Sequence, residues 1–295
     1  MNWIYLVIVA QFIGAIVFMV DKYLIASKSV GRPAVYAFYI GMLSGVVVLL
    51  LPLGVVSWPE MSVILISLAV AASFIFSILF LYNSLQTADA SDVAPVMGAI
   101  GAISTLLFSL LLLKTGLPSN FFVGFPLLIL GTFLMSAFRF DKRAALFVIL
   151  AGVMFGLSSV FVKMIFLRTD FFNGFFWSRI ANVIGAAMLL LWPANRKAIT
   201  ANIQTSRPST KLLVIGNKAL AGIAFFLTML AINLGDVATV NSLAGIQFVF
   251  LLILAFIFTY RLPKYFHEAV HQRHNRMKKI IASGLIIAGF LTLFY

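Results

Sequence analysis

Long apolar runs separated by short polar turns account for almost the whole chain. Runs of about 18 or more apolar residues are typical of helices that cross a bilayer. Only two polar interruptions have any length, 193–211 and 261–279, and neither is long enough to fold as a soluble domain. We therefore expect an all-α polytopic membrane protein of about ten transmembrane helices. The predicted spans are 3–24, 34–56, 62–86, 91–113, 119–138, 144–166, 172–193, 212–234, 237–260 and 277–295.

Short sequence matches relate the two halves of the chain. Ser91–Ala94 opens the fourth predicted span, and the similar stretch Gly235–Ala238 opens the ninth. The fifth and tenth spans share a late glycine inside an aliphatic run, Gly131 and Gly289. An odd number of spans per repeat requires the second repeat to insert upside down. Inverted repeats are typical of secondary transporters, whose solute site lies near the bilayer midplane between the halves.

A family resemblance rests on the same turns. The turn from Gln86 to Ala94 is similar to the strongest local pattern of the drug/metabolite transporter superfamily, in its ten-span EamA-like members. The stretch from Ile232 to Ala238 repeats that pattern, and the order of the motifs fits along the chain. The resemblance implies a multi-pass transporter of the plasma or inner membrane. Its two inverted five-helix repeats would be residues 1–143 and 144–295.

Charged residues are few and unevenly distributed. The chain is 63% hydrophobic and 10% charged, whereas a soluble domain is nearer half apolar and a quarter charged. The net charge of +13 comes from loop cations, which set topology and meet anionic lipid headgroups. We therefore expect the bilayer, and no nucleic acid, as a partner. The first apolar stretch lacks a basic segment before it and a cleavage site, so we expect a retained span.

The cations also predict an orientation. Loops after the odd-numbered spans, with the adjoining span ends, hold 16 of the 21 Lys and Arg residues, and those after the even-numbered spans hold 3. The positive-inside rule then places both termini outside the cytoplasm. The family resemblance implies the opposite orientation, and we favour the charge distribution.

Polar side chains inside apolar spans are candidates for a solute site, because they are costly in hydrocarbon. Arg179 lies about two turns into the seventh span, and Asn182 follows three residues later on the same face. A guanidinium can bind a carboxylate or phosphate through its bidentate fork. The alternative is that Arg179 reaches the interface or pairs with a loop carboxylate such as Asp170. Trp177 could frame a solute or belong to an interfacial aromatic belt.

Gln11 is the polar residue near the middle of the first span. The stretch from Ala10 to Gly14 resembles the first helix of small multidrug resistance proteins, whose membrane glutamate occupies the position of Gln11. An amide cannot titrate, so we expect exchange or facilitated diffusion rather than proton symport. Asn241 is expected to line a cavity or to bond between helices. Lys218 is expected to meet the solute or to extend toward the loop side.

Other polar and small residues have structural interpretations. Asp92 and Asp236 precede apolar runs and are expected to be N-caps. Two G-x-x-x-G pairs permit close helix packing, either within one chain or in a homodimer. These pairs are Gly41 with Gly45 and Gly152 with Gly156.

One segment matches a zinc motif. His267-Glu268-Ala269-Val270-His271 has the H-E-x-x-H spacing that sets two imidazoles on one helix face. The segment lies in a basic loop, and no carboxylate ligand from another span is evident. Cysteine is absent, which excludes disulfides and thiolate metal sites. We therefore expect no metal, cofactor or catalytic residue.

The sequence thus predicts a secondary transporter that moves a small polar anionic or zwitterionic metabolite, such as an amino acid or organic acid, by alternating access. The alternatives are an intramembrane metalloenzyme and a multidrug or lipid-handling exporter. The predicted substrate-binding residues are Arg179, Asn182, Gln11, Asn241, Trp177 and Lys218.

Overall fold

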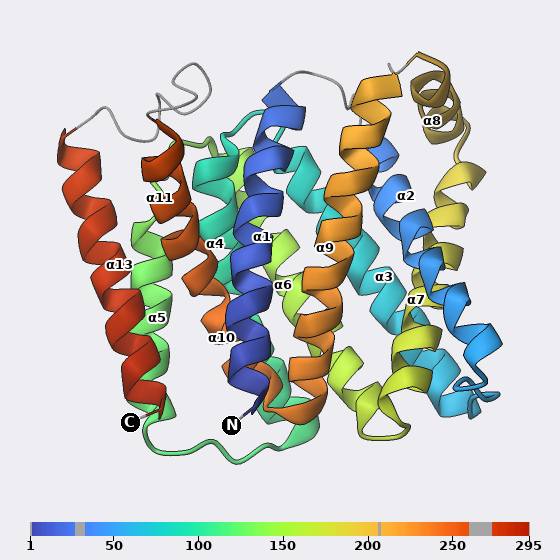
Figure 1. Ribbon diagram of the computed structural model, residues 1–295, viewed down its shortest axis with the longest axis horizontal. Coiled ribbons are helices and arrows are strands. Elements are labelled where there is room, and N and C mark those ends of the chain that lie inside the picture. Colours follow the sequence, from blue (N-terminus) through green and yellow to red (C-terminus); the bar gives the residue numbers. More distant parts are fainter. Residues whose placement is uncertain (1, 27–32, 206–207, 260–272, 295) are drawn as a thin grey trace.

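The computed structural model describes residues 2–26, 33–205, 208–259 and 273–294. Every regular element in these ranges is a helix, and eight of the described helices are long and apolar enough to cross a membrane (Figure 1). The prediction of an all-α, multi-pass membrane protein is confirmed. The elements are α1 (Asn2–Ala26), α2 (Pro33–Leu43), η1 (Ser44–Leu53), α3 (Met61–Ser84), α4 (Ala90–Phe108), η2 (Ser109–Leu113), α5 (Phe121–Leu134), α6 (Lys142–Phe166), α7 (Phe171–Met188), η3 (Leu189–Leu191), α8 (Pro193–Thr205), α9 (Pro208–Leu234), α10 (Val237–Ser242), η4 (Leu243–Gly245), α11 (Ile246–Thr259) and α13 (Arg273–Phe294).

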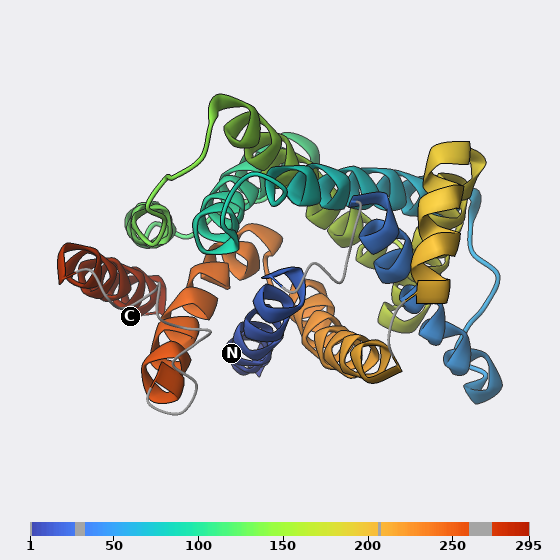
Figure 2. The same cartoon turned by 90° about the horizontal axis from the view of Figure 1, so that it is seen from above.

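The helices form a bundle in which partners far apart in sequence lie side by side. Helix α1 packs against α9 and α11, α3 packs along α6, and α5 pairs with α13 (Figure 2). Helix α1 begins and α13 ends at the same end of the bundle, which we call the terminal end (Figure 1). Helix α8 lies across the opposite end, which we call the loop end.

Glycines allow α6 and α4 to approach backbone to backbone. A Cβ atom added to Gly156 would lie 2.7 Å from the Thr105 nitrogen and 2.9 Å from the Gly101 oxygen. At Gly152 it would lie 3.0 Å from the Met97 oxygen. Only a residue without a side chain fits such contacts. This G-x-x-x-G pair therefore packs within the chain.

The pair α5–α13 has the same kind of contact. A Cβ at Gly289 would lie 2.8 Å from both the Gly124 oxygen and the Leu128 nitrogen. A Cβ at Gly131 would lie 2.8 Å from the Ala282 oxygen and 3.0 Å from the Ile286 nitrogen. Leu128 and Ile286 are fully buried at the centre of this contact.

The two aspartates predicted to be N-caps differ. Asp236 caps α10, since its carboxylate accepts a hydrogen bond from the Thr239 nitrogen at 2.8 Å. The prediction for Asp92 is wrong, because Asp92 lies inside α4. Its carboxylate accepts from the Ala137 nitrogen at 2.8 Å and the Arg139 nitrogen at 3.3 Å, and so holds the chain that leaves α5. This contact explains why α5 ends at Leu134, before the predicted limit of 138.

Several predicted boundaries differ from the observed ones. The second span continues from α2 into the 3-10 helix η1, which ends at Leu53 before a left-handed Gly54. The ninth span contains the 3-10 turn η4, where Gly245 faces Thr132 of α5. The polar stretch 193–211, which interrupts the predicted spans, contains α8, whose Ile199 is buried.

Candidate functional site

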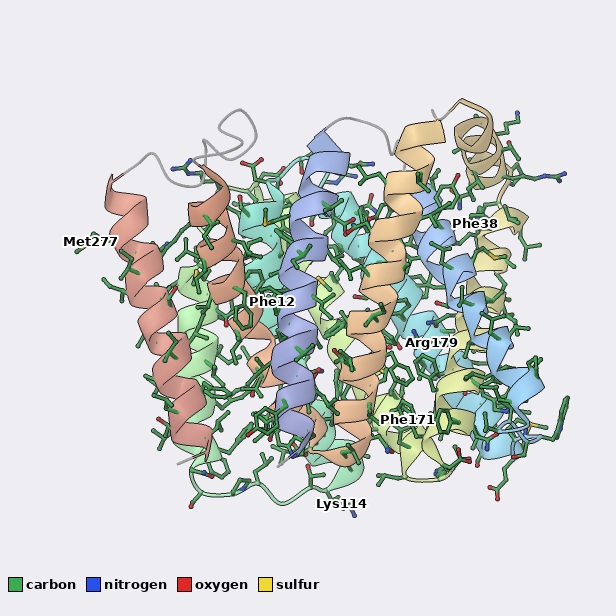
Figure 3. The ribbon with its side chains drawn as sticks, in the orientation of Figure 1. Phe12, Phe38, Lys114, Phe171, Arg179 and Met277 are labelled. Carbon is green, nitrogen blue, oxygen red and sulfur yellow. The ribbon has the colours of Figure 1, made fainter. Side chains whose placement is uncertain are left out.

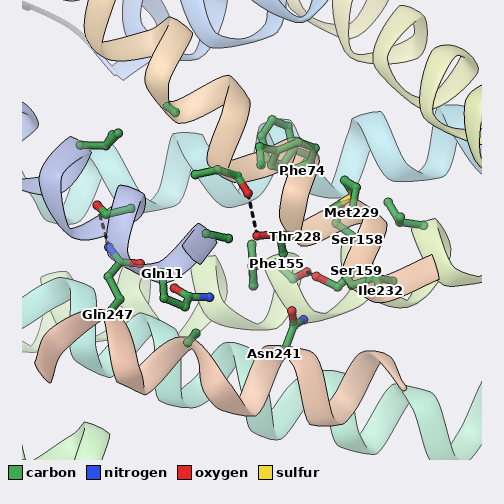
Figure 4. A pocket seen from close by; sticks show the side chains of 18 of the residues that line it. Gln11, Phe74, Phe155, Ser158, Ser159, Thr228, Met229, Ile232, Asn241 and Gln247 are labelled. Atoms are coloured by element: carbon green, nitrogen blue, oxygen red, sulfur yellow. Dashed lines mark hydrogen bonds between the residues drawn. The ribbon is translucent and has the colours of Figure 1, made fainter. Parts of the chain in front are cut away.

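A cavity of about 330 Å³ lies among helices from both sequence halves (Figure 4). Most of its wall is apolar, with a few amides and hydroxyls and two ionisable side chains. A volume near the lower end of the usual range for small-molecule sites suits a small metabolite. The lining residues are Ala10, Gln11, Gly14, Val17, Phe18, Asp21, Phe74, Phe155, Ser158, Ser159, Val162, Arg179, Ala221, Ala224, Phe225, Thr228, Met229, Ile232, Asn241, Ala244 and Gln247.

Arg179, which is labelled in Figure 3, supplies the positive charge of the cavity wall. Its guanidinium carbon lies 4.3 Å from the ring centroid of Phe225 and 5.7 Å from that of Phe74. The residue is 5% exposed, and its Nε has no hydrogen-bond partner among the described residues. Within that part of the chain, no carboxylate oxygen is recorded within 4 Å of the guanidinium.

The alternative pairing with Asp170 is not formed. The Asp170 carboxylate caps α7 by accepting from the Asn173 nitrogen at 3.1 Å, and it also accepts from the Asn173 amide. Burial raises the pKa of Asp170, but these hydrogen bonds outweigh it and hold the pKa below its ordinary value. Arg179 therefore faces the cavity without that counter-ion. A buried, unpaired cation costs several kcal/mol, roughly, which an anionic ligand would offset.

Three amides contribute to the wall (Figure 4). Gln11 is buried on α1. Asn241 donates through Nδ2 to the Thr105 hydroxyl at 2.9 Å, and so links α10 to α4. Gln247 donates through Nε2 to the Gly14 oxygen at 3.2 Å, and so links α11 to α1. Asn241 and Gln247 thus both line the cavity and both bond between helices.

Asp21 is the second ionisable residue of the wall, and its carboxylate is closely held. Oδ1 accepts from the Tyr36 hydroxyl, the Asn217 amide and the Lys218 ammonium, each at 2.8 Å. Lys218 also donates to Oδ2 at 2.9 Å. Lys218 is not part of the cavity wall, and its ammonium is held in this ion pair.

Asn182 and Trp177 lie outside the cavity wall. Asn182 is fully buried, and its side-chain nitrogen and oxygen have no partner among the described residues. Its backbone oxygen faces α2, where an added Cβ on Gly41 would approach it to 3.1 Å. Trp177 donates through Nε1 to the Ser57 oxygen at 3.1 Å and packs edge-on against Trp58.

A lysine joins α6 to the end of α9 beside the cavity. The Lys163 ammonium donates to the Ile232 and Gly235 oxygens at 2.8 Å and to the Asn233 oxygen at 3.2 Å. The Ile232 and Asn233 carbonyls belong to the last turn of α9, and Gly235 follows that helix, so the cation is favoured by the helix dipole. Val162 and Ile232 beside this contact line the cavity, so Lys163 holds α6 and α9 together at its margin.

Sequence reasoning missed several wall residues. Ser158, Ser159 and Thr228 are small polar residues inside apolar spans, and this was the signal available for them. Phe74 and Phe225 carried no signal, since aromatics are common throughout the spans. The histidine segment 267–271 lies outside the described residues, and no cluster of metal-ligating side chains occurs among those that are described.

These features define a multi-pass, all-helical membrane protein with a cationic cavity inside its helix bundle. The chain matches no protein-family model and no curated protein. One crystal structure of another protein is similar in fold, over 98% of this chain and 96% of that protein's chain. The TM-score is 0.64 at 18% sequence identity, which is a likeness of fold alone.

Proposed function

We propose that this protein is a secondary transporter that moves a small anionic or zwitterionic metabolite across the plasma or inner membrane by alternating access. The observation that carries the proposal is Arg179, a buried guanidinium that faces a cavity without a counter-ion among the described residues. Arginine binds carboxylates and phosphates through a planar fork of donors. The bound anion would supply the missing negative charge.

The rest of the wall supports recognition of a small solute. Phe74 and Phe225 flank the guanidinium and exclude water from it, which strengthens its attraction for an anion. Gln11 and Asn241 present amides that can orient the polar parts of a ligand. Small-molecule sites typically combine a mostly apolar wall with a few polar groups of this kind.

Two inverted five-helix repeats, and with them ten spans, are part of the proposal. The support comes from α5 and α13, in which Gly131 precedes Gly289, and Gly124 precedes Ala282, by the same 158 residues. The repeat relation therefore exchanges Gly131 with Gly289, and Ala282 with Gly124. It converts the contact between Gly131 and Ala282 into the contact between Gly289 and Gly124, and both contacts are present. A two-fold relation between repeats requires this exchange.

A second pair of contacts supports alternating access. In the repeat scheme, the contact between α6 and α4 corresponds to that between α1 and α11. The first contact is tight at Gly156, whereas at Gly14 the side chain of Gln247 is inserted between the helices. The two corresponding helix pairs thus have different separations. Exchange of these two separations between the pairs would move the cavity opening from one membrane face to the other.

Substitution of Arg179 tests the proposal. Arg179→Met removes the charge, and Arg168→Met, at an exposed arginine, is the matched control. We expect carboxylate metabolites that stabilise the purified wild type against heat to lose that effect in Arg179→Met and to keep it in Arg168→Met. Uptake into proteoliposomes should fall in parallel, and Gln11→Ala should weaken it less. Unchanged uptake of every transported solute in Arg179→Met would refute the site.

A further inference from the structure

The carboxylate of Asp21 has the chemistry of an ammonium site that is already occupied. It lines the same cavity as Arg179, and the Lys218 ammonium contacts both of its oxygens at 2.8 and 2.9 Å. The same ammonium lies 4.6 Å from the ring centroid of Tyr36. A carboxylate beside an aromatic face is a common arrangement for binding amines in proteins.

Lys218 already neutralises the Asp21 carboxylate, and two further donors bind the same group. Tyr36, Asn217 and Lys218 all donate to Oδ1, and Lys218 is the donor to Oδ2. The ammonium of an amino acid could become the counter-ion of Asp21 only by displacing Lys218, because a second cation beside this ion pair would add an unbalanced positive charge. That displacement would leave the lysine, whose side chain is 9% exposed, without its partner.

The charges around the cavity then leave one cation uncompensated. Asp21 and Lys218 neutralise each other, and the Lys163 ammonium is bound by three carbonyls at the margin. Arg179 remains as the charged group of the wall without a partner among the described residues. The cavity therefore complements one negative charge.

We propose that the substrate is a monoanion with an apolar body, and that Lys218 excludes zwitterionic amino acids by occupying their ammonium position. This inference rests on the proposed function and narrows its substrate class. The apolar body would lie against Phe18, Phe155, Val162 and Met229, which form much of the wall.

A set of phenyl compounds with matched bodies tests the proposal. The probes are four phenyl compounds that differ in charge at neutral pH. They are 3-phenylpropanoate (a monoanion), phenylalanine (a zwitterion), phenylsuccinate (a dianion) and 3-phenylpropanamide (neutral). Binding to the full-length protein in detergent is measured by thermal stabilisation and by titration calorimetry. We expect the wild type to bind phenylpropanoate about tenfold or more tightly than phenylalanine, since the zwitterion would leave a charged group unpaired.

Two substitutions should shift this preference in opposite directions. Lys218→Met opens the Asp21 carboxylate, so phenylalanine should become the preferred ligand. Asp21→Asn leaves the lysine charge in place, so phenylsuccinate should gain relative to phenylpropanoate. Lys114→Met, at an exposed lysine, is the control and should keep the order of the wild type. If Lys218→Met does not fold, Asp21→Asn and the double variant test the same charges, and the double variant should again prefer the monoanion.

The outcomes separate this inference from the proposed function. Equal binding of phenylalanine and phenylpropanoate by the wild type, or an unchanged order in folded Lys218→Met and Asp21→Asn, would overturn the inference. If Arg179→Met loses all anion binding, that result supports the proposed function whether or not these outcomes overturn the inference. Absence of any binding by the wild type would also overturn the inference, whereas uptake of other anions in proteoliposomes would still support a transporter.

Discussion

Replacing Gly289 by alanine tests whether α5 and α13 touch through their backbones. The added methyl carbon would lie 2.8 Å from the Gly124 oxygen and from the Leu128 nitrogen, and neither atom can move by a change of rotamer. The helices must therefore separate, and overpacking of this kind costs about 1–3 kcal/mol. Alanine is better than glycine in a helix by about 1 kcal/mol, which offsets part of that cost.

The matched control lies on the same helix. Gly284 is exposed, and a Cβ there would meet no atom within 4 Å, so Gly284→Ala gains the helix propensity without the clash. Because the gain in helix propensity is the same in both variants, the stability difference between them should equal the overpacking cost, about 1–3 kcal/mol. In apparent Tm at one fixed heating rate, Gly289→Ala should lie about 2–12 °C below Gly284→Ala.

The corresponding position in the first half gives a second test. Gly131→Ala meets two backbone atoms at 2.8 and 3.0 Å and should lower the apparent Tm by a similar amount. If Gly289→Ala proves as stable as Gly284→Ala, the close contact is wrong. If only Gly131→Ala is harmless, the two-fold relation between the repeats loses its support.

Three further substitutions test other contacts. Lys163→Met leaves three carbonyls at the C-terminal end of α9 without their donor, and it should lower stability by about 2–4 kcal/mol in thermal unfolding; no loss would refute the contact. Asp92→Ala releases the chain after α5 and should cost about 1–3 kcal/mol, whereas the exposed Asp89→Ala, whose side chain makes no capping hydrogen bond, should cost clearly less. Because the protein has no cysteine, single-cysteine variants can report the cavity. Ser159→Cys, in the cavity wall, should react with a water-soluble maleimide at least tenfold faster than Ser77→Cys, which is buried outside that wall, and equal rates would argue against a solvent-filled cavity there.

Much of the fold could be predicted because the bilayer imposes a simple rule on the sequence. Apolar runs predicted the long helices, because backbone N–H and C=O groups in hydrocarbon must form their hydrogen bonds within one helical segment. Helix α8 was missed because Pro193–Thr205 is polar and lies across the bundle end, where that rule does not apply. The end of α5 was also missed, because it depends on Asp92, which comes from a different helix.

For the candidate site, the sequence identified polar residues but not their directions. Arg179 attracted attention as a cation inside an apolar run, and the structure places it in the cavity wall. Asn182 shares its helical face by spacing, yet that part of α7 is covered by α2. The pairing of Lys218 with Asp21 joins residues 197 positions apart, and a single sequence contains no signal for such a contact.

The Arg179 guanidinium, which has no ion-pair partner among the described residues, would also affect which step of a transport cycle is slow. Under the proposed function, the empty carrier would have to move its binding site past the membrane interior with one net positive charge, whereas the carrier with a monoanion would be neutral. A membrane potential acts on a moving charge by up to about 2.3 kcal/mol per 100 mV, so voltage would act mainly on the return of the empty carrier. Countertransport of one anion for another avoids that return, and Arg179 would thereby favour one-for-one antiport over net flux.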